Sequence, residues 1–269
     1  MNLSINYSPA AAALYTQGKI RIDAFKVPDW QDLVAAARAI CVPAVHFPLQ
    51  AGSGKLNQTD WRLVDRLLAE TATPYINLHL DPHGKDFPGI PLDSTHPAHK
   101  AQVFERLLED VMVVVNRYGA ERVIAENVPY QGLKGEYLRP GSEPEVISRL
   151  IEESGCGLLL DIAHARISAH AMGYSDREYL ERLPTQRIRE LHFAGVHSLP
   201  DGWQDHLAIL PDDWNLLEWV LERIRSGVWS HPWMLAFEYG GVGSIFEWRS
   251  DPEVIASQVP RLYALVHEV

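Results

Sequence analysis

The sequence has little cysteine: its 269 residues include only Cys41 and Cys156. The two thiols form no Cys-x-x-Cys pair, which excludes a metal site built from closely spaced thiolates. Each lies beside an apolar segment, where a free cysteine packs as a small hydrophobic residue. We therefore expect a protein without disulfides, as is usual in the cytoplasm.

Long apolar runs and an excess of positive charge are also missing. No run approaches the roughly 20 apolar residues that cross a bilayer, and the N-terminal segment MNLSINYSP lacks the basic and apolar regions of a secretory signal. The chain has 24 basic against 35 acidic residues and a net charge of −11. Because duplex binding requires basic residues against the phosphates, this charge balance argues against nucleic acid as a partner. Together with the missing apolar runs and signal, it leads us to expect a cytoplasmic protein that binds neither a membrane nor nucleic acid.

Short apolar runs alternate with helical patterns from one end of the chain to the other. Near-continuous apolar runs are typical of parallel strands that are covered on both faces. Eight such runs separated by helices predict an α/β fold, a single (β/α)8 TIM barrel over residues 1–269. The predicted strands are residues 3–7, 20–27, 42–49, 75–80, 122–128, 157–162, 188–196 and 233–239.

Helical patterns fill the intervals between these runs. Residues 59–71 keep Leu63, Leu67 and Leu68 on one face after a predicted N-cap at Thr59. Residues 100–119 form the longest pattern and end at Gly119, a helix C-terminal signal. The long loops follow the fourth, fifth and seventh strands, at the end of the barrel where such enzymes build their active sites.

Metal-binding side chain types recur near the C-terminal ends of the six later strands. In strand order they are His46, His79, Glu126, Asp161, His192 and Glu238. His164 follows Asp161 by three residues, and His206 lies in the loop after the seventh strand. A single histidine in a strand is more often a hydrogen-bonded core residue than a ligand. Because barrel strands converge, however, the whole set is expected to face one small volume.

The charges of this set predict a metal site. Three carboxylates in one volume repel each other strongly unless cations compensate them, and the sequence shows no matching set of Lys or Arg at these strand ends. Imidazole and carboxylate donors without thiolate suit iron, zinc, manganese or cobalt. Five histidines and three carboxylates exceed the ligand number of one ion, so we expect two or three divalent ions.

Three segments resemble a known family. GCGLLLDIAHARISAHAMGY (155–174), YLERLPTQRIRELHFAGVHS (179–198) and DHLAIL (205–210) are similar to the multinuclear non-heme iron-dependent oxidative enzymes. This family lies within the xylose-isomerase-like TIM barrels, which also include endonuclease IV and ketose epimerases. The resemblance is clearest over residues 155–206. It implies two or three irons, O₂-dependent modification of cysteine residues in ribosomally made peptides, and often a separate peptide-recognition protein.

The resemblance also implies site residues, with three departures. His164 stands where the family has asparagine, Gln204 stands where it has the Asp of Asp-x-His, and Tyr239 replaces an acidic residue after the last strand. We expect Asp205 to take the place of the missing aspartate. We take Glu126, Glu238 and His164 as the catalytic candidates. The predicted metal ligands are His46, His79, Glu126, Asp161, His164, His192, Asp205, His206 and Glu238.

Three enzymatic functions remain open at this point. The first is an iron-dependent oxidation of a peptide thiol or a similar small group. The second is a sugar isomerase or epimerase with one Mn or Co ion, in which Glu126 and Glu238 act as acid and base. The third is a trinuclear-zinc phosphodiesterase of the endonuclease IV type, which the acidic net charge disfavours. The substrate is accordingly a small molecule or a peptide.

Overall fold

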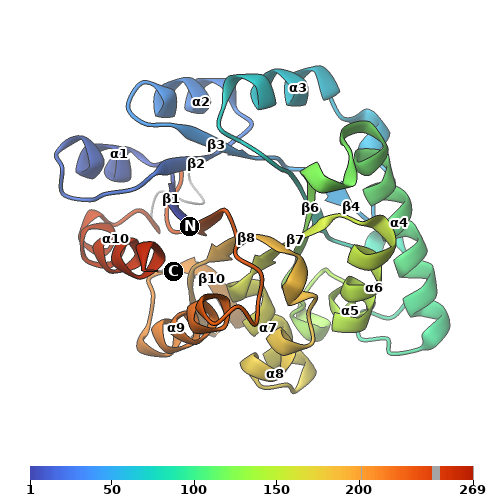
Figure 1. Ribbon diagram of the computed structural model, residues 1–269. Helices are drawn as coiled ribbons and strands as arrows, with labels where there is room; N and C mark the ends of the chain where they lie inside the picture. Colours follow the sequence, from blue (N-terminus) through green and yellow to red (C-terminus); the bar gives the residue numbers. More distant parts are fainter. Residues whose placement is uncertain (201, 244–248, 269) are drawn as a thin grey trace.

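Nine parallel strands form one sheet in the computed structural model, which describes residues 1–200, 202–243 and 249–268 (Figure 1). The strand order is β3–β2–β1–β11–β8–β7–β6–β5–β4. The predicted α/β barrel is confirmed, and each of the eight predicted strands has a counterpart. The strands are β1 (Asn2–Asn6), β2 (Ala24–Pro28), β3 (Pro43–His46), β4 (Gln50–Ala51), β5 (Ile76–Leu80), β6 (Val123–Asn127), β7 (Gly157–Asp161), β8 (Ile188–Phe193) and β11 (Met234–Phe237).

The barrel closes between β3, the counterpart of the third predicted strand, and β4, which follows the end of that predicted strand. β3 pairs with β2 and β4 pairs with β5, so the two ends of the sheet are consecutive in the chain. Between them Asn77 substitutes for a strand partner: its Oδ1 accepts a hydrogen bond from Phe47 N at 2.8 Å, and its Nδ2 donates to Phe47 O at 3.1 Å. A side-chain amide therefore completes the main-chain ladder at this seam.

Helices cover the outside of the sheet (Figure 1). Their apolar faces supply much of the core, for example Val103, Leu107 and Val111 of the longest helix, each fully buried. Among the described residues, no helix is long and apolar enough to span a bilayer. The helices are α1 (Pro9–Thr16), α2 (Gln31–Arg38), α3 (Trp61–Glu70), α4 (Pro97–Tyr118), α5 (Arg139–Ser142), α6 (Pro144–Ser154), α7 (Ile162–Met172), α8 (Asp176–Glu181), α9 (Pro211–Arg225) and α10 (Pro252–His267).

Several predicted boundaries are corrected. Helix α3 is capped by Asp60 rather than Thr59, because the Asp60 carboxylate accepts hydrogen bonds from the main-chain N–H groups of Arg62 and Leu63 at 3.1 and 3.3 Å. The predicted end of α4 at Gly119 is confirmed by a φ of 87°, which favours glycine. The strand predicted over 188–196 stops at Phe193, and an antiparallel hairpin follows, made of β9 (Gly195–Leu199) and β10 (Gly202–Leu207).

Candidate metal centre

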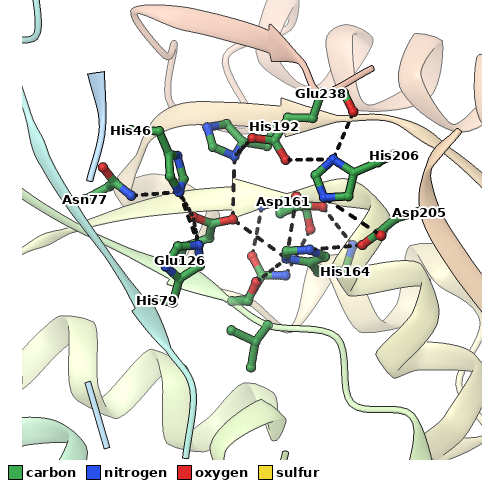
Figure 2. Close-up of polar contacts among 12 residues, drawn as sticks. His46, Asn77, His79, Glu126, Asp161, His164, His192, Asp205, His206 and Glu238 are labelled. Atoms are coloured by element: carbon green, nitrogen blue, oxygen red, sulfur yellow. Dashed lines mark hydrogen bonds and ion pairs between the residues drawn. The ribbon is translucent and has the colours of Figure 1, made fainter. Parts of the chain in front are cut away.

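All nine predicted ligands lie in one connected network at the C-terminal end of the barrel strands (Figure 2). Parallel register explains why the strand residues meet. His79 of β5 is the register partner of Glu126 of β6, and Asp161 of β7 is the partner of His192 of β8. Residues at one register level of a barrel point into the same cross-section, so neighbouring strands deliver their side chains to one place.

The first group consists of His46, His79 and Glu126. His46 Nε2 and His79 Nε2 are 3.1 Å apart, and they lie 3.6 and 3.3 Å from Glu126 Oε2. Burial by itself would raise the pKa of Glu126, but His79 and His192 hold it well below its usual range. Burial lowers the pKa of His46 to about 3, which leaves its imidazole neutral and able to bind a cation.

The central group consists of Asp161, His192 and Glu238. His192 Nδ1 lies 3.0 Å from Glu238 Oε1 and 3.5 Å from Glu126 Oε1. Oε1 of Glu126 therefore faces this group, while Oε2 faces His46 and His79. Burial raises the pKa of Asp161 to about 6, and Asn127 fixes its position by accepting from Asp161 N at 3.0 Å and donating to Asp161 O at 2.9 Å.

The hairpin group consists of His164, Asp205 and His206. Consecutive residues of a regular strand point to opposite faces, but the pairing of β10 with β9 is irregular between Gln204 and Leu207. His206 has a φ of 57°, and it is the one non-glycine residue of the described chain with a positive value. This bulge brings the side chains of Asp205 and His206 to the same side, where Asp205 lies against His164, and bulges commonly redirect side chains in this way beside active sites.

The carboxylate of Asp205 lies against both histidines of the hairpin group. Asp205 Oδ2 lies 3.1 Å from His164 Nε2, and Asp205 Oδ1 lies 3.9 Å from His206 Nε2. Burial opposes ionisation, but the two histidines lower the pKa of Asp205 to about 2. His164 Nδ1 lies 2.8 Å from the carbonyl oxygen of Asn127 and donates to it, so Nε2 is the nitrogen that faces the hairpin.

Three residues behind the centre were missed in the sequence. Glu190 Oε1 lies 3.0 Å from His192 Nε2 and forms a buried ion pair with Lys26, while Trp233 Nε1 donates to Glu190 Oε2 at 2.8 Å. Burial opposes ionisation, but Lys26 and His192 lower the pKa of Glu190 to about 2. Lys26 of β2 is a single cation beside these strands, and it is paired with Glu190. The two-residue spacing of Glu190 and His192, which places both on one face of β8, was the available signal.

The donor set fits divalent cations. The network holds the four carboxylates of Glu126, Asp161, Asp205 and Glu238, and the ammonium of Lys26 is already paired with Glu190. Glu126 Oε2 and His192 Nδ1 are buried and make no hydrogen bond of suitable geometry. Such atoms require an explanation, and a cation bound between them would supply one. The groups His46–Glu126–His192 and Asp161–His192–Glu238 each place three ligand atoms within 4.8 Å of one another, as do Glu126–Asp161–His164 and His164–Asp205–His206.

The profile of one protein family, described as RiPP precursor modification enzyme MbnB/TglH/ChrH, matches residues 51–235. The chain belongs to this family. The matched range contains every candidate ligand except His46 and Glu238. The MbnB/TglH/ChrH family is one of enzymes that modify precursors of ribosomally made peptides, and the family resemblance of the sequence is thus confirmed.

Curated relatives match parts of the chain. A UPF0276 protein from Acaryochloris marina is 29% identical over 138 residues, covering 51% of this chain and 44% of that protein. Another, from Paraburkholderia phytofirmans, is 33% identical over 124 residues, covering 46% and 37%. The alignments therefore span less than half the length of these two relatives.

Solved structures share the fold over the whole chain. D-psicose 3-epimerase from Clostridium cellulolyticum H10 with D-tagatose has a TM-score of 0.59 at 12% identity and covers 100% of this chain and 99% of that chain. A D-tagatose 3-epimerase-like protein has a TM-score of 0.57 at 15% identity, with the same coverage. At such identities the likeness establishes a xylose-isomerase-like barrel and leaves the reaction open.

Proposed function

We propose that this enzyme holds two or three iron ions and oxidises a cysteine residue of a ribosomally made peptide with O₂. The observation that carries the proposal is the orientation of Glu126. Its Oε2 faces Nε2 of His46 and of His79, and its Oε1 faces His192 Nδ1 at 3.5 Å. A carboxylate with each oxygen directed at a different set of imidazoles is suited to bridge two ions.

The other residues divide between binding ions and holding protons. Further donors come from the central and hairpin groups, namely Asp161, His192, Asp205 and His206. When bound there, iron would supply the electrons for O₂ reduction and a positive charge for a substrate thiolate. Glu238 and His164 belong to these groups as well and line the cavity, so each is also placed to hold a proton close to the substrate. We also propose that a separate recognition protein presents the peptide, as the family resemblance implies.

A mononuclear sugar isomerase is the second candidate. Glu126, Asp161, His192 and Glu238 occur in the ligand order of that class, and the similar solved structures include epimerases. Two observations favour the first candidate. The first is that His46 and His79 converge on Glu126. An isomerase that holds one ion with the four residues just named does not need these two histidines as ligands. The opposite side of the cavity is apolar, although a sugar requires hydrogen-bond partners for its hydroxyl groups.

The test is the metal content after anaerobic purification and ferrous reconstitution. We expect two or three irons per chain, and O₂ consumption when a cysteine-containing peptide is added. Glu126→Gln should lose more than one ion, because it removes the shared ligand, whereas Glu153→Gln on the surface should lose none. A single Mn or Co per chain would favour the isomerase, and three zincs the phosphodiesterase. A wild-type chain that binds no metal would overturn the proposal.

A further inference from the structure

The cavity above the metal centre has two unlike sides. It encloses about 290 Å³. One side, the donor side, presents His46, His79, Glu126, His164, His206 and Glu238. The other side, here the apolar wall, presents Tyr7, Val27, Pro28, Trp30, Leu33 and Pro48. The wall comes from β2, α2 and the segments that follow β1, β2 and β3.

The apolar wall offers contact area and little charge. Trp30 lines the cavity and is 52% exposed, so much of its aromatic surface is not covered by the rest of the protein. The basic group that lines the cavity beside the wall is Lys26, and its ammonium is paired with the buried Glu190. An exposed aromatic beside a line of aliphatic and proline side chains favours a ligand with an apolar surface.

We propose that the apolar wall binds an aromatic or aliphatic side chain of the residue next to the one that reacts, and that Trp30 determines this specificity. The inference rests on the proposed function, because the donor side would hold the reacting group. The wall and the donors line the same cavity, so a peptide anchored at a metal ion necessarily lays its neighbouring residue against one of the flanking surfaces. The cavity is at the lower limit of ordinary ligand pockets, which suits one or two side chains rather than a folded domain.

Other occupants fit this surface less well. A sugar would leave hydroxyl groups without partners against Trp30 and Leu33, and burying such groups is unfavourable. A phosphodiester would require cations, and Lys26 is already neutralised by Glu190. A second copy of the chain would cover Trp30 but would also close the entrance to the donors.

The test compares two capped dipeptides, N-acetyl-Cys-Phe-amide and N-acetyl-Cys-Ser-amide, and the reversed pair Phe-Cys and Ser-Cys. Binding is measured by calorimetry without O₂, on the iron-loaded and on the metal-free protein. We expect a Phe-containing probe to bind at least tenfold more tightly than its Ser counterpart, as burial of an aromatic side chain predicts. Trp30→Ala should reduce that ratio to about twofold or less while metal content and Ser-probe affinity remain unchanged.

The control is Val228→Ala, which removes an apolar side chain that is 45% exposed and precedes β11 at the other end of the barrel. It should leave the ratio intact. Equal affinities for Phe and Ser probes in an iron-loaded wild-type protein would overturn this inference and leave the proposed function standing. A Phe preference in a protein that binds no metal would support the wall and overturn the proposed function. Dimerisation that Trp30→Ala abolishes would overturn the inference in favour of a second copy.

Discussion

Glu190 and His192 lie on one face of β8, with Glu190 Oε1 3.0 Å from His192 Nε2. With Nε2–H donating to Glu190, Nδ1 is the nitrogen that faces Glu126 and Glu238, and in the neutral imidazole it carries the lone pair that would bind a cation. A carboxylate behind a histidine is the usual means of orienting a metal-binding imidazole. Lys26 and Trp233 hold Glu190 in turn, so the orientation of His192 is set from inside the barrel.

The first prediction concerns this buried pair. Removing Glu190 alone would leave the charge of Lys26 unpaired, which typically costs about 3–5 kcal/mol. The double variant Lys26→Met/Glu190→Leu avoids that charge while it removes the acceptor for His192. We expect its metal affinity to fall about 10–100-fold, measured by competition with a chelator. Lys26→Met/Glu190→Gln is the matched control, because glutamine keeps an acceptor and should lose less affinity. Identical affinities in the two variants would refute the positioning role.

The second prediction concerns metal removal. Glu126, Asp161, Asp205 and Glu238 repel each other in the metal-free protein, and bound cations relieve that repulsion. A free ion concentration 100-fold above the dissociation constant should raise the free energy of unfolding by about 2.7 kcal/mol. Thermal denaturation with ferrous ion and with EDTA measures the difference. A melting temperature that is the same under both conditions would show that the folded state binds no ion at this centre.

The third prediction concerns His164, where the chain departs from its family. Its Nε2 lies 3.1 Å from Asp205 Oδ2, within the hairpin group. We expect His164→Ala to lower the bound metal by about one ion per chain, while the group around His46 and His79 keeps its ion. His231→Ala is the control, because this histidine is exposed and precedes β11, at the other end of the barrel. Unchanged metal content in His164→Ala would mean that His164 is not a ligand.

The fourth prediction concerns the seam of the barrel. Asn77→Ala removes both partners of the Phe47 main chain, which is buried and has no strand neighbour at this point. Unpaired buried polar groups cost about 1–3 kcal/mol each, so we expect a loss of at least about 1 kcal/mol. Urea denaturation of the metal-free protein measures it. Asn57→Ala, at an exposed position, should change the stability by no more than about 0.5 kcal/mol. Equal midpoints for the two variants would contradict the role of Asn77.

The strands and the convergence of the candidate residues could be predicted because both follow from local rules. Apolar runs such as 157–162 identify buried parallel strands, and parallel strands place equivalent ends together. His46, His79, Glu126, Asp161 and His192 therefore meet without any knowledge of loop structure. The same rules fail between Phe47 and Leu49, where the apolar pattern continues although the ladder stops. Only the tertiary partner, Asn77, distinguishes this break from a continuous strand.

The hairpin could not be predicted for a different reason. Alternation assigns Asp205 and His206 to opposite faces, and only the bulge and the positive φ of His206 bring them to one side. These are consequences of packing, because His206 Nδ1 lies 2.9 Å from the carbonyl oxygen of Glu238, far away in the sequence. Lys26 and Glu190 were missed because a charged residue in the middle of a predicted strand is assigned to the solvent-facing side unless a buried partner of opposite charge is known.

Within the part of the chain that the structure describes, the two-stranded hairpin of β9 and β10 makes no strand pairing with the barrel sheet. An ion held by His164, Asp205 and His206 would fasten this hairpin to α7. Order in the hairpin and occupancy of the site would then be reciprocal quantities, so that each stabilises the other by the same free energy. Substitutions near Leu199, which touch none of the donors, would shift metal affinity through the hairpin alone. The amide exchange rate in β9 would in turn decrease as the occupancy of the site rises, so the order of the hairpin would depend on the concentration of available metal.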